Sequence, residues 1–204
     1  MNQPMLPRIG AACGAVFAIV LTVAVGNGSQ SFSDSRAVAG IAALTLAIPF
    51  LAYLTSVLRQ AEGTDGWLAR AALATGIVGI TLKLGSGAPE LAMYRAHLAA
   101  GTQLHSAIDA IGGGATVLSL YPLAVFCAAT AIVAFRTRAL PRWLATGAAV
   151  TAAALAVNGV FLTTDFVPAM LMFALWTALA SVHLLRRTWH NPARVARAQA
   201  SAST

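Results

Sequence analysis

Charged residues are scarce in this sequence. Asp, Glu, Lys and Arg together make up 9% of its 204 residues, whereas ordinary soluble domains carry about 25%. Hydrophobic residues make up 58%, and the mean hydropathy is +0.76. A soluble fold of this length could not hide so much apolar surface, because much of any protein surface must still face water. The composition therefore excludes an ordinary soluble domain and predicts a membrane protein.

Cysteine is also rare. Cys13 and Cys127 each lie inside an apolar run, where a thiol behaves as a small hydrophobe without a neighbour that would stabilise the thiolate. We therefore expect neither a disulfide nor redox chemistry, and no Cys/His spacing resembles a zinc site. The sequence also lacks a phosphate-binding loop, a nucleophile elbow, a metalloprotease helix and a dinucleotide fingerprint. Neither a metal nor a cofactor is expected.

Six apolar runs alternate with short polar connectors. Each run is long enough to cross the hydrocarbon core of a bilayer as a helix. The runs cover residues 9–26, 37–58, 67–86, 115–135, 143–162 and 166–185. We expect an all-α, polytopic transmembrane helical bundle formed by residues 1–190. The tail of residues 191–204 is basic and then Ala/Ser-rich, which predicts a disordered cytoplasmic segment. Glycine and alanine pairs spaced by four, such as Gly10 and Gly14, predict close packing of helix backbones.

Basic residues mark the predicted orientation. The formal net charge is +7, but the cations lie between apolar runs and not on one face, which argues against nucleic-acid binding. Three of the 13 basic residues, Arg36, Lys83 and Arg95, fall on one predicted side of the membrane. The other ten fall on the opposite side: Arg8, Arg59, Arg70, Arg136, Arg138, Arg142, Arg186, Arg187, Arg194 and Arg197. The positive-inside rule then predicts a multi-pass cell-membrane protein with both termini cytoplasmic, and the lipid bilayer is its expected partner.

The longest polar interruption runs from residue 83 to residue 114 and faces away from the cytoplasm in this topology. Residues 89–100 have the mixed character of a short interfacial helix, since Pro89 suits a first helical turn. Glu90, Tyr94 and His97 would share one face of that helix. This segment is the expected location of a functional site.

A second helical piece, residues 103–111, follows and leads to Gly112, Gly113 and Gly114. In it His105 and Asp109 are spaced by four, so the carboxylate could orient the imidazole for general base chemistry. A bend at residue 101 could bring His97, His105, Asp109 and Glu90 together near Asp165, in an outward-facing polar pocket. The alternative is structural: histidine and tyrosine sit comfortably at headgroup depth, and Asp109 could simply neutralise Lys83 or His105.

Three functions are consistent with these patterns. The leading hypothesis is a non-enzymatic bundle that binds a small ligand, or a membrane or extracytoplasmic protein partner, through its outer face. The residues expected to bind are Tyr94, Arg95, Lys83, Asn158 and Asp165. The alternatives are a small permease and a membrane-embedded hydrolase or transferase. The enzyme would use the catalytic candidates His105, Asp109, His97 and Glu90. Homo-oligomerisation stays open.

The segment of residues 136–147 reads RTRALPRWLATG. Its core, Leu140-Pro141-Arg142-Trp143-Leu144, resembles the start of a span in a family of small bacterial membrane proteins of unknown function. In that family an aliphatic residue separates the leucine from the proline, and this chain lacks it. The opening Arg8-Ile9-Gly10 also resembles the family's start. The resemblance implies a helical bundle of about this size and no particular activity.

Overall fold

The structure is a computed structural model, and it describes residues 5–26, 34–64, 66–95, 102–161 and 167–190. Every regular element in these ranges is an α-helix. The six helices are α1 (Met5–Gly26), α2 (Asp34–Glu62), α3 (Trp67–Arg95), α4 (Gln103–Thr137), α5 (Arg142–Val160) and α6 (Val167–His190). The prediction of an all-helical bundle is confirmed.

Five of the helices are long and apolar enough to cross a membrane. The qualifying stretches are Gly40–Glu62, Trp67–Pro89, Gln103–Thr137, Arg142–Val160 and Pro168–Arg187. Among the residues of α1 whose side chains the structure describes, the apolar stretch is Arg8–Val23. Large apolar side chains such as Ile19, Val150 and Leu175 lie exposed on the outside of the bundle. The chain therefore has the architecture of a multi-pass membrane protein.

Two breaks that the sequence suggested are absent. Residues 89–100 were expected to form a separate helix, but α3 continues through Pro89 to Arg95. Likewise, α4 runs without interruption through the three glycines at 112–114. The two helices pack tightly here: a Cβ atom on Gly112 would lie 3.2 Å from the carbonyl oxygen of Ser86. Three helical glycines together cost about 3 kcal/mol, and the close packing of α3 on α4 outweighs this local preference for a break.

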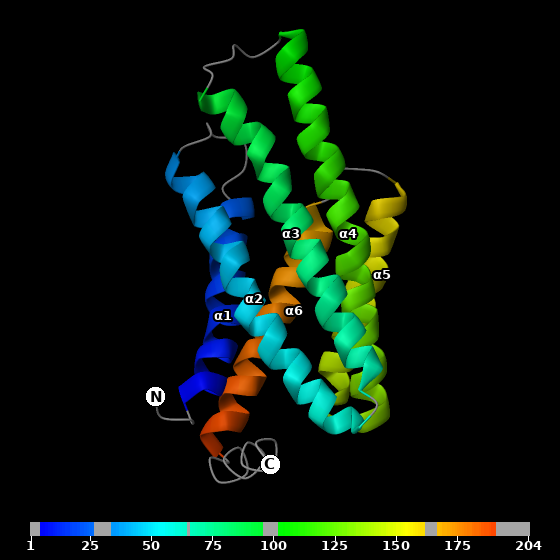
Figure 1. Ribbon diagram of the computed structural model, residues 1–204. Coiled ribbons are helices and arrows are strands. Elements are labelled where there is room, and N and C mark those ends of the chain that lie inside the picture. Colours follow the sequence, from blue (N-terminus) through cyan, green and yellow to red (C-terminus); the bar gives the residue numbers. More distant parts are fainter. Residues whose placement is uncertain (1–4, 27–33, 65, 96–101, 162–166, 191–204) are drawn as a thin grey trace.

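The α3–α4 hairpin is longer than the rest of the bundle. α4 has 35 residues, about 50 Å at the usual helical rise, whereas α5 has 19. Figure 1 shows the hairpin projecting beyond the other helices at one end. At the opposite end lie the start of α1, the end of α6 and both the α2–α3 and α4–α5 connections. Odd-numbered and even-numbered helices therefore run in opposite directions.

The α2–α3 turn is fixed by local chemistry. Gly63 and Gly66 adopt positive φ angles of 89° and 33°, which side-chain-bearing residues rarely adopt. The Glu62 carboxylate then accepts hydrogen bonds from the backbone N–H groups of Leu68 and Ala69, at 3.3 and 3.0 Å. These bonds satisfy amide groups that the first turn of α3 leaves without intrahelical acceptors.

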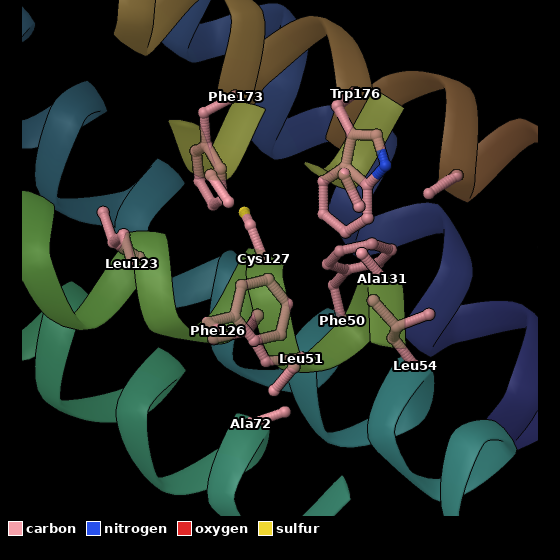
Figure 2. Close-up of a cluster of buried hydrophobic side chains, with 14 of the residues drawn as sticks. Phe50, Leu51, Leu54, Ala72, Leu123, Phe126, Cys127, Ala131, Phe173 and Trp176 are labelled. Carbon is pink, nitrogen blue, oxygen red and sulfur yellow. The ribbon is translucent and has the colours of Figure 1, made fainter. Parts of the chain in front are cut away.

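An aromatic cluster from three helices forms the centre of the core (Figure 2). Phe173 of α6 packs against Phe17 of α1, Phe126 of α4 and Trp176 of its own helix, with ring centroids 6.1 to 6.5 Å apart. The indole Nε1 of Trp176 donates to the carbonyl oxygen of Leu144, at 3.0 Å. The α6 helix is thereby joined to α5 as well as to α1 and α4.

Small residues bring the helices close together. Gly14 of α1 lies against Phe50 of α2 and Ser181 of α6, and Gly10 lies against Tyr53 of α2. Ala72, like most core alanines, is fully buried. The close approach that the Gly10/Gly14 spacing predicted is confirmed. Several buried hydroxyls bond to carbonyls one turn earlier in their own helix, as Ser181 does to Thr177 at 2.7 Å, so they need no partner on another helix. The buried Thr130 hydroxyl is an exception and has no hydrogen-bond partner among the described residues.

Candidate functional site

The polar site expected on the outer face falls partly beyond the described residues. His97 and Asp165 lie outside them. Glu90 and Tyr94 belong to α3, but their side chains are likewise outside the described part. Because α3 does not break at residues 87–88, the expected interfacial helix cannot fold back at its start.

His105 and Asp109 occupy adjacent turns near the start of α4. The His105 backbone N–H donates to the Thr102 side chain at 3.2 Å, so Thr102 caps the helix. Among the described residues no hydrogen bond or ion pair joins the imidazole to the Asp109 carboxylate, which is exposed, and His105 Nδ1 has no partner. The carboxylate–imidazole pair suggested by the spacing is not formed. Across the described ranges, no three His, Cys, Asp or Glu side chains gather where a metal ion could bind.

The remaining outer candidates are separated from one another. Lys83 Nζ donates to the Thr116 hydroxyl at 3.1 Å and links α3 to α4. Arg95 is exposed at the last residue of α3, and Asn158 is buried in α5. Lys83 is therefore a link within the hairpin.

A concavity lies at the opposite end of the bundle, where the α4–α5 connection meets α6 (Figure 1). We call it the basic depression. Its volume is about 510 Å³, and its lining residues are Arg138, Ala139, Leu140, Pro141, His183, Arg186 and Arg187. Three of the seven lining residues are arginines, and no lining residue carries a carboxylate.

The α4–α5 connection forms one wall of the basic depression. Arg138 ends α4 in the left-handed conformation, with φ 55°, and its N–H donates to the Ala134 carbonyl oxygen at 2.9 Å. Ala139 N–H donates to the Thr137 hydroxyl at 3.3 Å, and Leu140 is buried in the core. Pro141 is the N-cap residue of α5. The connection is short and anchored on both sides, so its shape is well determined.

α6 forms the other wall. Arg187 Nη1 donates to the Ala139 carbonyl oxygen at 3.2 Å, across 48 residues of sequence. Arg186 is the next residue back along α6, and His183 lies one turn earlier. This hydrogen bond holds a guanidinium group over the connection, so positive charge from two distant segments meets at one place.

The start of α5 adds to the positive potential. No side chain caps this helix, and the first internal bonds run from Leu144 and Ala145 to Pro141. The amides of Arg142 and Trp143 therefore have no intrahelical acceptor, and a helix N-terminus carries about half a positive charge. Pro141 adds an apolar ring to the lining. The arrangement suits an anionic group attached to an apolar or uncharged body.

The sequence analysis did not find this site. It used the arginines of residues 136–142 and of residues 186–187 only as signs of orientation, and did not bring the two segments together. The sequence signal that could have indicated the site was the predicted topology, because it placed residues 136–142 and residues 186–187 on the same side of the membrane. No family model, curated protein or solved structure matches the chain.

Proposed function

We propose that the protein is a six-span integral membrane protein whose basic end faces the cytoplasm. α1 would be the sixth span, because its apolar run reaches Gly26 in the sequence. The eight described arginines of the ten-residue basic set belong to the end where α1 begins and α6 ends. The positive-inside rule assigns that end to the cytoplasm, and the exposed apolar side chains along the helices would then meet lipid.

Cysteine labelling of the full-length chain in cells tests this topology. Cys13 and Cys127 are first replaced by alanine, and single cysteines are introduced at the exposed positions Thr64 and Gln103. A membrane-impermeant maleimide should label Gln103→Cys on intact cells, and Thr64→Cys only after permeabilisation. Equal labelling of both variants on intact cells would contradict the six-span topology, and the reverse pattern would contradict the orientation.

We further propose that the protein acts by binding an anionic ligand in the basic depression. The observation that carries this proposal is the convergence of Arg138, Arg186 and Arg187 on a concavity with no carboxylate in its lining. Guanidinium groups bind phosphate and carboxylate through paired N–H donors. The hydrogen bond from Arg187 to Ala139 holds one of these groups in place before any ligand arrives, which reduces the entropy lost on binding.

Inorganic pyrophosphate is a suitable soluble probe of this site. At ten times its dissociation constant it should stabilise the purified protein by about 1.4 kcal/mol, and so raise the Tm in detergent by about 3 °C at low salt. The Arg186→Gln/Arg187→Gln variant should lose this shift. The Arg59→Gln/Arg70→Gln variant has the same net charge and alters exposed arginines outside the depression, so it should keep the shift. An equal response in all three proteins would refute the site.

A further inference from the structure

We infer that the ligand of the basic depression is the headgroup phosphate of an anionic phospholipid in the adjacent leaflet. This inference rests on the proposed function, because it names the ligand class of the same site. It adds a source for the ligand, which is the membrane itself and not the aqueous phase.

The chemistry of the rim fits a phosphate diester. A guanidinium carries five N–H donors, and the bond from Arg187 to the Ala139 carbonyl uses one of them. Arg138 and Arg186 are exposed at the same depression and add two more planar donor groups. The amides at the start of α5 lie next to the lining residue Pro141. Together these groups can surround the non-bridging oxygens of one phosphate.

The position of the depression favours a lipid over a soluble anion. It lies where three apolar helices end or begin: α4 ends at Thr137, α5 begins at Arg142, and α6 ends at His190, about one turn after Arg187. A spanning helix ends near the level of the lipid headgroups. Anionic headgroups in the cytoplasmic leaflet are held at this level, so the site would always face a high local concentration of them.

Apolar side chains beside the rim extend the fit beyond the phosphate. Phe135 and Trp143 flank the α4–α5 connection, and each has about half of its surface exposed, 50% and 54%. Tryptophan in such a place is typical of the membrane interface. Pro141 contributes apolar lining. A phospholipid would place its phosphate at the arginines and its glycerol and acyl carbons along these side chains, whereas an inorganic anion could use only the arginines.

Native mass spectrometry of the full-length protein in detergent tests this inference. The protein is offered an equimolar mixture of dioleoyl phosphatidylglycerol and dioleoyl phosphatidylcholine, which share the same acyl chains. The wild-type protein should retain the anionic lipid with a preference of about thirtyfold, which corresponds to about 1 kcal/mol for each of two basic residues near a headgroup. The Arg186→Gln/Arg187→Gln variant should retain both lipids about equally, while Arg59→Gln/Arg70→Gln should keep the wild-type preference.

The lipid experiment and the pyrophosphate experiment together distinguish the phospholipid assignment from the anion site itself. A wild-type protein with no lipid preference would overturn the inference, while a Tm shift with pyrophosphate would leave the anion site standing. Equal loss of preference in both double variants would also overturn it, because diffuse charge and not the depression would then attract the lipid. In a third arm, soluble glycerol 1-phosphate is added at the lipid concentration. Full displacement of the lipid would assign the site to free phosphate esters instead.

Discussion

The Gly14→Ala variant is expected to lose about 3 kcal/mol of stability, the upper part of the range for overpacked cores. An added Cβ would overlap the Phe50 ring and the Ser181 hydroxyl, and its distance from Phe50 Cγ would be 2.6 Å. Phe50 is 1% exposed and Ser181 is fully buried, so neither side chain has room to withdraw. α1 would have to move away from both α2 and α6. The loss should appear as a lower Tm and less monodisperse protein in detergent.

The Gly114→Ala variant is the matched control. It makes the same chemical change in a helix, but no atom lies within 4 Å of the added Cβ. It should therefore stabilise α4 by up to about 1 kcal/mol, the difference in helix propensity. A second variant, Gly14→Ala with Phe50→Leu, should recover part of the lost stability if the Phe50 ring is the obstacle. Equal melting temperatures for Gly14→Ala and Gly114→Ala would show that α1 does not pack as described.

The Phe173→Ala variant should cost about 3 kcal/mol, the lower end for a buried phenylalanine. Its ring contacts Phe17, Phe126 and Trp176, and only 2% of its surface is exposed. Removing it leaves a cavity where α1, α4 and α6 meet. The lower value applies because a chain unfolded within lipid still has apolar surroundings, so the loss comes mainly from packing and not from transfer out of water.

Leu175→Ala is the control for this prediction. Leu175 lies two residues along the same helix and is 61% exposed, so its truncation leaves no cavity and should change stability by less than about 0.5 kcal/mol. Unfolding in mixed detergent, followed by tryptophan fluorescence, gives both values, since Trp176 lies in the same cluster. Similar losses for the two variants would mean that the aromatic cluster does not hold these helices together.

The outer candidate site shows that residue spacing alone does not predict which side chains form hydrogen bonds. The interval of four between His105 and Asp109 put both on one side of a helix, and they are indeed one turn apart in α4. Spacing could not decide whether the side chains bond, and among the described residues they do not. Asp109 is exposed to solvent, where a charged hydrogen bond gains little over hydration.

The basic depression is a site that no spacing in the sequence suggested. Neither Arg138 nor the pair Arg186 and Arg187 carries a motif, and each alone indicates only the inner side of a membrane. Their meeting depends on the left-handed residue at the end of α4 and on the bond from Arg187 to the Ala139 carbonyl. Contacts across such a separation leave no periodic signal in the chain, so only the folded structure could reveal the site.

The sequence by itself determined the helical class, the positions of the apolar helices and the end of the bundle at which arginine accumulates. These are local properties, since each follows from the hydropathy and charge of consecutive residues. The tertiary structure alone decided that α3 passes Pro89, that α4 passes its three glycines, and that two arginine-bearing segments share one depression. The physical reason is that interhelix packing exceeds the local costs, about 3 kcal/mol for three helical glycines and about 3 kcal/mol for a proline inside a helix, and no local pattern encodes which helices will meet.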